Sequence, residues 1–185
     1  MEGVGRGKVR LLAHSTAWDE EFAQVKAEIE AAWGPAVLDI QHVGSTAISS
    51  ICAKPILDVA VRLADIEAMD IAALTVRGYE HCGPQFGRDS YHLFVLRGGD
   101  GRSLRHIHCY DRREEEFFQL VGFRDYLNAH PDTAVQYEKL KRELAQRWPD
   151  DRVQYTAGKA AFIAAVYARL GPRQPCGDSE PKNSF

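Results

Sequence analysis

Apolar residues recur at helical spacing near the start of the chain, and they predict a helix from Ser15 or Thr16 to about Trp33. The apolar stripe of this helix consists of Phe22, Val25, Ile29 and Ala32. Acidic residues at 19–21 fall in its first turn, where the helix dipole favours negative charge. Residues 1–8 are rich in glycine and charge, so we expect a loose end before this helix.

Apolar runs and alternating patterns further along predict strands at 37–43, 56–63, 79–82, 91–96 and 104–110. The last two form a hairpin across the glycines at 98–101, and residues 86–89 are expected to be a loop. A second helix is predicted at 66–76, ended by Gly78. In the strand at 56–63, alternation places Leu57, Val59, Val61 and Leu63 on a core face and Ile56, Asp58, Ala60 and Arg62 on the other.

From residue 114 the pattern becomes helical, with helices predicted at 114–128, 131–148 and 151–170. The whole chain therefore predicts an α+β protein, a small mixed sheet followed by a C-terminal helical bundle. We divide it into an α/β part at 1–112, a helical part packed on it at 113–171, and a disordered tail at 172–185. The junction between sheet and bundle is the expected cleft.

The composition is ordinary for a soluble protein, with 45% hydrophobic and 26% charged residues in 185. The net charge of −3 gives no electrostatic reason to expect nucleic acid or an anionic membrane as a partner. No apolar run reaches the roughly 20 residues of a membrane span, and no signal-peptide pattern opens the chain. We therefore expect a cytoplasmic protein with reduced cysteines.

The turn after the first strand has the chemistry of a phosphate site. Gly44 allows a sharp turn with positive φ, while Ser45 and Thr46 can cap a helical turn whose free N–H groups attract phosphate. Asp58 follows inside an otherwise apolar strand. A carboxylate there is costly to bury unless a metal ion, a cation or hydrogen bonds compensate it.

The strand at 104–110 carries two histidines on one face. His106 and His108 can converge on one ion, and Asp58 from a neighbouring strand can complete a set for Mg²⁺ or Mn²⁺. One of the histidines can act instead as a catalytic base, since Mg²⁺ prefers oxygen ligands. The alternative is that both imidazoles are partly exposed and merely hydrogen-bonded.

Basic residues in all three C-terminal helices fall on or beside inward-facing stripes. Together with two further bases, they are candidates for neutralising polyphosphate: Lys54, Arg88, Arg124, Lys141 and Lys159. The alternative for each is that a long side chain reaches past the apolar surface to water.

These residues resemble a known family. The strings HVGSTAISSICAKPILDVAV (42–61), HIH (106–108), FRDYLNAHP (123–131), YEKLKREL (137–144) and YTAGKAAFI (155–163) are similar, in this order, to the GrpB family of the nucleotidyltransferase-fold superfamily. The resemblance covers about residues 8–170. It departs at Ile48-Ser49-Ser50, where the family usually has a turn like valine-proline-glycine.

The resemblance implies the superfamily's pattern of a Gly-Ser turn, an Asp-x-Asp (or Glu) strand and a third acid on a later strand. Asp58 matches the first acid, but Ala60 stands at the second, and His106 and His108 stand where the third is expected. The usual arrangement of two metal ions and three carboxylates therefore cannot be built in the standard way.

The expected function is binding of ATP or another nucleoside triphosphate with a divalent metal, and attack on its α-phosphate by a small-molecule acceptor. With a carboxylate acceptor the product is an acyl-adenylate, as in an adenylate-forming ligase. Two alternatives stay open: a non-catalytic nucleotide- or coenzyme-binding module, and a metal-dependent phosphohydrolase. The sequence leaves the acceptor, the base preference and the oligomeric state open.

Overall fold

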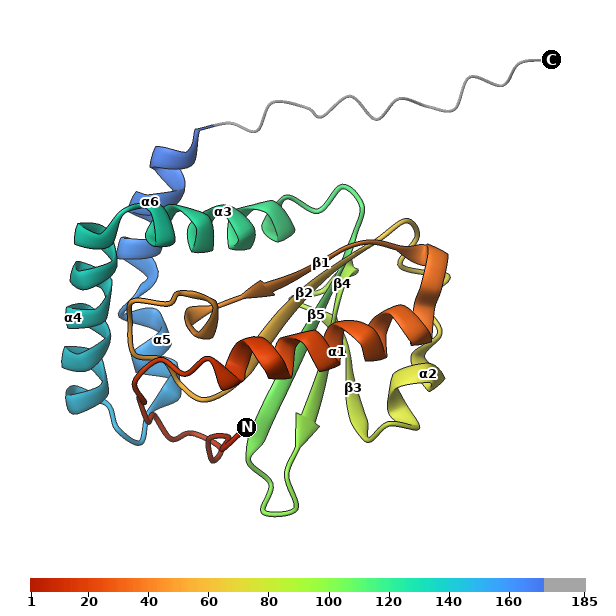
Figure 1. The fold of residues 1–185 in the computed structure, drawn as a ribbon, viewed down its shortest axis with the longest axis horizontal. Helices are drawn as coiled ribbons and strands as arrows, with labels where there is room; N and C mark the ends of the chain where they lie inside the picture. The colour runs from red at the N-terminus through yellow and green to blue at the C-terminus, as the bar shows by residue number, and fades with distance from the viewer. Residues whose placement is uncertain (172–185) are drawn as a thin grey trace.

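The computed structural model describes residues 1–171 as a five-stranded sheet with helices on both faces and a helical bundle at one end (Figure 1). The strands are β1 (Val37–Val43), β2 (Leu57–Leu63), β3 (Tyr79–Gln85), β4 (Arg88–Arg97) and β5 (Ser103–Asp111). The helices are α1 (Ala17–Trp33), α2 (Ile71–Thr75), α3 (Glu115–Ala129), α4 (Pro131–Arg147), α5 (Arg152–Ala157) and α6 (Ala160–Leu170), with single 3₁₀ turns η1 (Gly34–Ala36) and η2 (Ser45–Ala47). The predicted tail at 172–185 lies outside the described residues.

The sheet is mixed, with strand order β1-β2-β5-β4-β3. Strands β2 and β5 run parallel, whereas the other neighbouring pairs are antiparallel. The parallel register sets Asp58 beside His106 and Ala60 beside His108. Paired residues of neighbouring strands point to the same face, so this register brings the three ionisable groups together.

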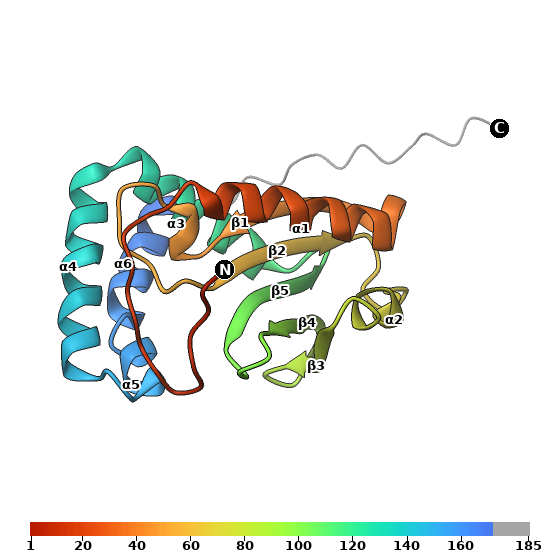
Figure 2. The same ribbon diagram turned by 60° about the horizontal axis from the view of Figure 1, so that its bottom comes forward.

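One face of the sheet packs against α1, which contacts β1 and β2 (Figures 1 and 2). The predicted core face of β2 is confirmed, because its four apolar residues are fully buried in this cluster. On the opposite face, Ala60 and Tyr110 pack with Phe117 at the start of α3. Asp58 therefore points away from the main core, towards the C-terminal helices.

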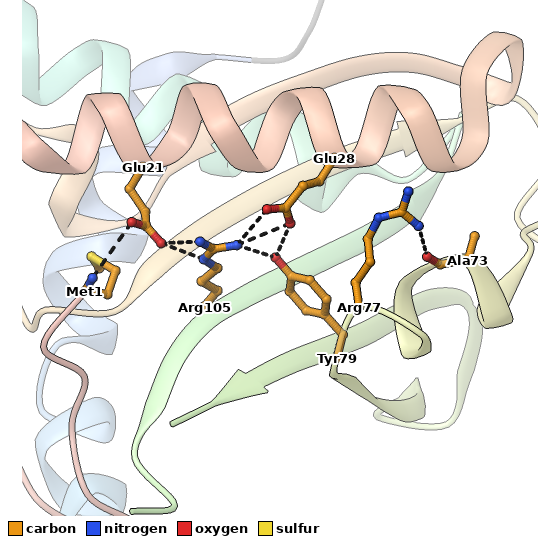
Figure 3. A network of polar contacts seen from close by, with 7 residues as sticks. All are labelled: Met1, Glu21, Glu28, Ala73, Arg77, Tyr79 and Arg105. Carbon is orange, nitrogen blue, oxygen red and sulfur yellow. Dashed lines mark hydrogen bonds and ion pairs between the residues drawn. The ribbon is translucent and has the colours of Figure 1, made fainter. Parts of the chain in front are cut away.

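Arg105 of β5 holds α1 onto the sheet through a polar network (Figure 3). Its guanidinium donates to Glu21 at 2.6 Å and to Glu28 at 3.2 Å, both on α1. Tyr79 of β3 joins it, accepting from Arg105 at 3.0 Å and donating to Glu28 at 3.1 Å. The amino group of Met1 adds an ion pair to Glu21 at 3.8 Å.

The bundle and the sheet share buried residues. Ile48 and Ile51, in the connection between β1 and β2, pack with Phe123, Tyr137 and Val166 from α3, α4 and α6. The connection that follows the Gly44 turn is therefore held by the bundle core. This arrangement fixes the position of the turn relative to the helices.

The structure differs from the sequence predictions in three local elements. The helix predicted at 151–170 is two helices separated at Gly158, where any side chain would collide with Leu144 of α4. The helix predicted at 66–76 forms only at Ile71–Thr75, because the side chain of Asp70 accepts hydrogen bonds from two amides there and starts the helix late. The predicted loop at 86–89 is a two-residue turn, so Arg88 already belongs to β4.

The N-terminal segment is not the loose end expected from its composition. Val4 pairs with Ser103, and the amide of Arg152 donates to the carbonyl of Gly7 at 3.0 Å. The segment thus connects the sheet to the turn before α5. Among residues 1–171, no helix is long and apolar enough to cross a membrane.

Candidate functional site

Gly44 ends β1 with a backbone conformation that brings the main chain directly against Asp58. Its φ is 70° and its ψ is −170°, a region that residues with a side chain rarely adopt. A Cβ added at this position would lie 2.6 Å from Oδ2 of Asp58. The glycine therefore serves both the turn and the close approach of the carboxylate.

Asp58, His106 and His108 form a compact group on the face of the sheet away from α1. His106 Nδ1 lies 2.9 Å from Asp58 Oδ1, and His108 Nε2 lies 3.6 Å from the same oxygen. One ligand atom from each of the three residues lies within 4.8 Å of the others. Burial alone would raise the pKa of Asp58, but hydrogen bonds and charge from both imidazoles outweigh it and hold the pKa well below its usual range.

The donor set of this group fits a divalent transition ion better than Mg²⁺. Two imidazole nitrogens and one carboxylate are suitable ligands for Mn²⁺ or Zn²⁺, whereas Mg²⁺ takes mainly oxygen. The three donors are close enough to converge on one centre. The sequence prediction of a shared site for these residues is thus compatible with the geometry.

A cavity of about 190 Å³ opens beside Asp58, between the Gly44 turn and the bundle. Its walls come from the β1–β2 region, α3, α4, α5 and α6, and they are Gly44, Ser45, Lys54, Asp58, Leu120, Phe123, Tyr137, Tyr155, Lys159, Ile163 and Tyr167. Asp58 belongs both to this wall and to the histidine group. The cavity lies at the junction of sheet and bundle, where the sequence predicted a cleft.

Two lysines give the cavity its positive charge. The ammonium groups of Lys54 and Lys159 lie 5.5 Å and 4.8 Å from the ring centre of Tyr155. Burial lowers the pKa of Lys54 to about 7, assisted by repulsion from Lys159 and Arg152. Burial likewise lowers the pKa of Lys159. An anion in the cavity would relieve this repulsion and favour the charged forms.

Of the predicted phosphate ligands, Gly44, Ser45, Lys54 and Lys159 therefore face one cavity. Thr46 lies behind the turn, where its Oγ1 is 2.9 Å from Nε2 of the buried His42. Lys141 is fully buried, donates to the carbonyl of Cys52, and has its pKa lowered to about 8 by burial. It supports the segment that carries Lys54 without lining the cavity.

The two predicted arginines point elsewhere. Arg124 donates to Gln41 at 2.9 Å and to the carbonyl of His42 at 2.8 Å, so it ties α3 to β1. Arg88 pairs with Glu114 and Glu116 at the start of α3, at 3.3 Å and 2.5 Å. Neither arginine lines the cavity.

Sequence reasoning did not single out the aromatic walls of the cavity, in particular Tyr137, Tyr155 and Tyr167. Tyr137 and Tyr155 lie one helical turn before Lys141 and Lys159, so their inward orientation was available from the same stripe. Tyr91, whose hydroxyl lies 2.7 Å from Nδ1 of His108, was also missed. Only the pairing of β4 with β5 brings it there.

The fold belongs to the nucleotidyltransferase class. The structure matches that of Cid1 in complex with the UTP analogue UMPNPP with a TM-score of 0.50 at 13% identity, over 74% of this chain and 43% of that one. At this identity the match concerns the fold alone. It confirms the predicted α+β architecture of nucleotidyltransferase type.

The chain is a member of the GrpB family, whose model, described as GrpB protein, matches residues 8–169. It is 36% identical to the glutamate-rich protein GrpB of Alkalihalophilus pseudofirmus, over 90% of this chain and 98% of that one. The crystal structure of conserved protein GrpB from Enterococcus faecalis superposes with a TM-score of 0.78 at 30% identity, covering 87% of this chain and 96% of that one. A dephospho-CoA kinase of Mycolicibacterium paratuberculosis is 25% identical over 90% of this chain, which spans 47% of the kinase.

Proposed function

We propose that this protein is a nucleotidyltransferase-like enzyme that binds a nucleoside triphosphate, ATP in the simplest case, together with a divalent metal ion. The observation that carries the proposal is the position of Asp58. Its carboxylate is shared by the histidine group, which can hold an ion, and by the lysine-lined cavity, which can hold phosphates. The nucleotidyltransferase fold, which Cid1 also has, supports it.

In this proposal each group has a distinct role. Asp58, His106 and His108 hold the ion, which when bound neutralises phosphate charge and activates the attacking group. The Gly44-Ser45 turn and the ammonium groups of Lys54 and Lys159 bind the triphosphate oxygens.

The attacking group comes from a small-molecule acceptor and displaces pyrophosphate from the α-phosphate. A hydroxyl or amine acceptor becomes nucleotidylated, and a carboxylate acceptor becomes an acyl-adenylate. The tyrosines of the cavity wall exclude water around the reacting groups, which strengthens every charge interaction there.

A second candidate is a non-catalytic module that senses a nucleotide or coenzyme. Ala60 favours it, because the position two residues after Asp58 on the same strand face lacks a second carboxylate. The similarity to part of a dephospho-CoA kinase is consistent with a coenzyme ligand. The same cavity and the same lysines would then bind without reaction.

Thermal unfolding tests binding directly. With Mn²⁺ and a non-hydrolysable ATP analogue at about 100 times the Kd, we expect the Tm to rise by roughly 5–10 °C. Asp58→Asn and Lys159→Met should remove this shift, whereas Lys139→Met, which removes an exposed lysine of the same bundle, should keep it. A wild-type protein whose Tm responds to no nucleotide and to no nucleotide-containing coenzyme would contradict both candidates.

Pyrophosphate release then separates the two candidates. The protein is incubated with ATP, Mn²⁺ and a pool of small hydroxyl, amine and carboxylate compounds. Acceptor-dependent pyrophosphate supports the enzyme, while binding without any turnover supports the module. Phosphate release without an acceptor would instead identify a metal-dependent phosphohydrolase.

A further inference from the structure

Tyr91 contacts His108 on the side of the imidazole that faces away from Asp58. Its Oη lies 2.7 Å from His108 Nδ1, while His108 Nε2 points to Asp58 Oδ1 at 3.6 Å. Tyr91 comes from β4, directly opposite Tyr110 of β5, and the two rings stack with centroids 4.6 Å apart. Tyr91 is 5% exposed, and its hydrogen bond to His108 is partly buried.

The hydroxyl of Tyr110 is an unusual group within this arrangement. It is buried and has no hydrogen-bond partner of regular geometry among residues 1–171. The ring of Tyr91 lies against that of Tyr110, with the two ring planes inclined by only 19°. A buried hydroxyl without a partner is costly, so its presence beside a functional histidine calls for an explanation.

We infer that Tyr91 and Tyr110 are positioning residues that determine which nitrogen of His108 carries the proton. The inference rests on the metal site of the proposed function. A histidine that binds an ion through Nε2 must carry its proton on Nδ1, and a hydrogen bond from Nδ1 to an oxygen fixes that tautomer and the ring orientation. In this chain the only oxygen hydrogen-bonded to Nδ1, among the described residues, is that of Tyr91.

The two states of His108 differ by a rearrangement of protons that balances. Without an ion, Nε2–H would face the Asp58 carboxylate, whose Oδ1 lies 3.6 Å away, and the hydroxyl of Tyr91 would donate to Nδ1. With an ion, the proton leaves Nε2 for solvent and another is gained at Nδ1, so the imidazole stays neutral. Nδ1–H then donates to Tyr91 Oη, and the Tyr91 hydroxyl turns to donate to Tyr110 Oη, which has no competing partner.

Removing single hydroxyl groups tests this series of hydrogen bonds from His108 through Tyr91 to Tyr110. In titrations of Mn²⁺ followed by calorimetry, Tyr91→Phe and Tyr110→Phe should each weaken binding about 10- to 100-fold. Tyr110→Phe should at the same time leave the ion-free protein as stable as the wild type or more stable, because it removes the unpartnered hydroxyl. Tyr126→Phe, which removes a hydroxyl bonded to Arg169 away from the site, is the control and should bind like the wild type.

The tautomer itself can be followed by ¹⁵N NMR of the His108 ring. We expect Nε2–H in the ion-free protein and Nδ1–H after addition of the diamagnetic ion Zn²⁺. If wild type and Asp58→Asn both fail to bind Mn²⁺ and Zn²⁺, the proposed metal site is wrong and the inference with it. If wild type binds and Asp58→Asn does not, but both tyrosine variants bind normally or the tautomer stays unchanged, the inference alone is wrong.

Discussion

Replacing Gly44 by alanine tests whether the main chain of the turn and the Asp58 carboxylate are built as one unit. The alanine Cβ would lie 2.6 Å from Oδ2, 3.0 Å from Cβ and 3.2 Å from Cγ of Asp58. Heavy atoms cannot approach this closely, so the aspartate has to move. Its 2.9 Å hydrogen bond to His106 is then lost or distorted.

The magnitude has two parts. A residue other than glycine in this backbone conformation costs about 1–3 kcal/mol. Loss of a hydrogen bond to a charged group costs about 1.5–3 kcal/mol more. Gly44→Ala should therefore lower the free energy of unfolding by about 2.5–6 kcal/mol, a large fraction of the stability of a typical domain.

Urea unfolding followed by tryptophan fluorescence measures this loss. Gly171→Ala is a matched control, since Gly171 has φ 70° and ψ 174° but no atom of the described residues within 4 Å of an added Cβ. Gly171→Ala should lower the free energy of unfolding by at most the backbone part of about 1–3 kcal/mol. In the background of Asp58→Ala the contacts with Oδ2 and Cγ are absent and only the 3.0 Å contact with Cβ remains, so Gly44→Ala should there cost little more than the backbone part of about 1–3 kcal/mol. If Gly44→Ala lowers the free energy of unfolding equally with and without the aspartate side chain, the proposed coupling of the Gly44 turn to Asp58 is refuted.

Two pH dependences follow from the buried bases. The pKa of Lys54 falls to about 7 on folding, so above that pH the unfolded chain binds more protons than the folded protein, and the free energy of unfolding should rise by a few kcal/mol between pH 7 and 10. Urea unfolding should show a smaller rise in Lys54→Met than in Lys139→Met. Equal rises in the two variants would contradict the assignment to Lys54. The pKa of His42 falls to about 4 through burial, so stability should decrease by about 3 kcal/mol as pH falls from 6.5 to 4. His42→Gln should flatten this acid slope, and an unchanged slope would show that His42 is not its source.

The sequence was informative wherever the relevant interaction follows from local periodicity. Alternation in β2 separated Asp58 from the core residues, and the spacing of His106 and His108 put both on one face of β5. For the carboxylate and the two imidazoles to lie close together, it was then enough that β2 and β5 be neighbouring strands. Parallel pairing of β2 with β5 provides this, with Asp58 directly beside His106.

The basic residues were harder to predict because a helical stripe gives the direction of a side chain but not its partner. Lys159 and Arg124 both lie near inward stripes, yet Lys159 faces the cavity while Arg124 donates to the carbonyl of His42. Arg88 pairs with carboxylates more than twenty residues away in the chain. Such choices depend on tertiary packing, which the local pattern of the sequence does not contain.

The register of the sheet also bears on the missing carboxylate of the superfamily pattern. Ala60 lies on the same face as Asp58 and directly beside His108, and it is fully buried. The small side chain leaves the neighbouring position to the imidazole of His108, whose Nε2 lies 3.6 Å from Asp58 Oδ1. An imidazole from the adjacent strand thus takes the place where a second carboxylate would add negative charge. Because a neutral nitrogen donor replaces an anionic oxygen, a site of this composition should select Mn²⁺ or Zn²⁺ over Mg²⁺, and an ion bound there would keep more of its positive charge for a triphosphate than beside a second carboxylate, adding to the charge of Lys54 and Lys159.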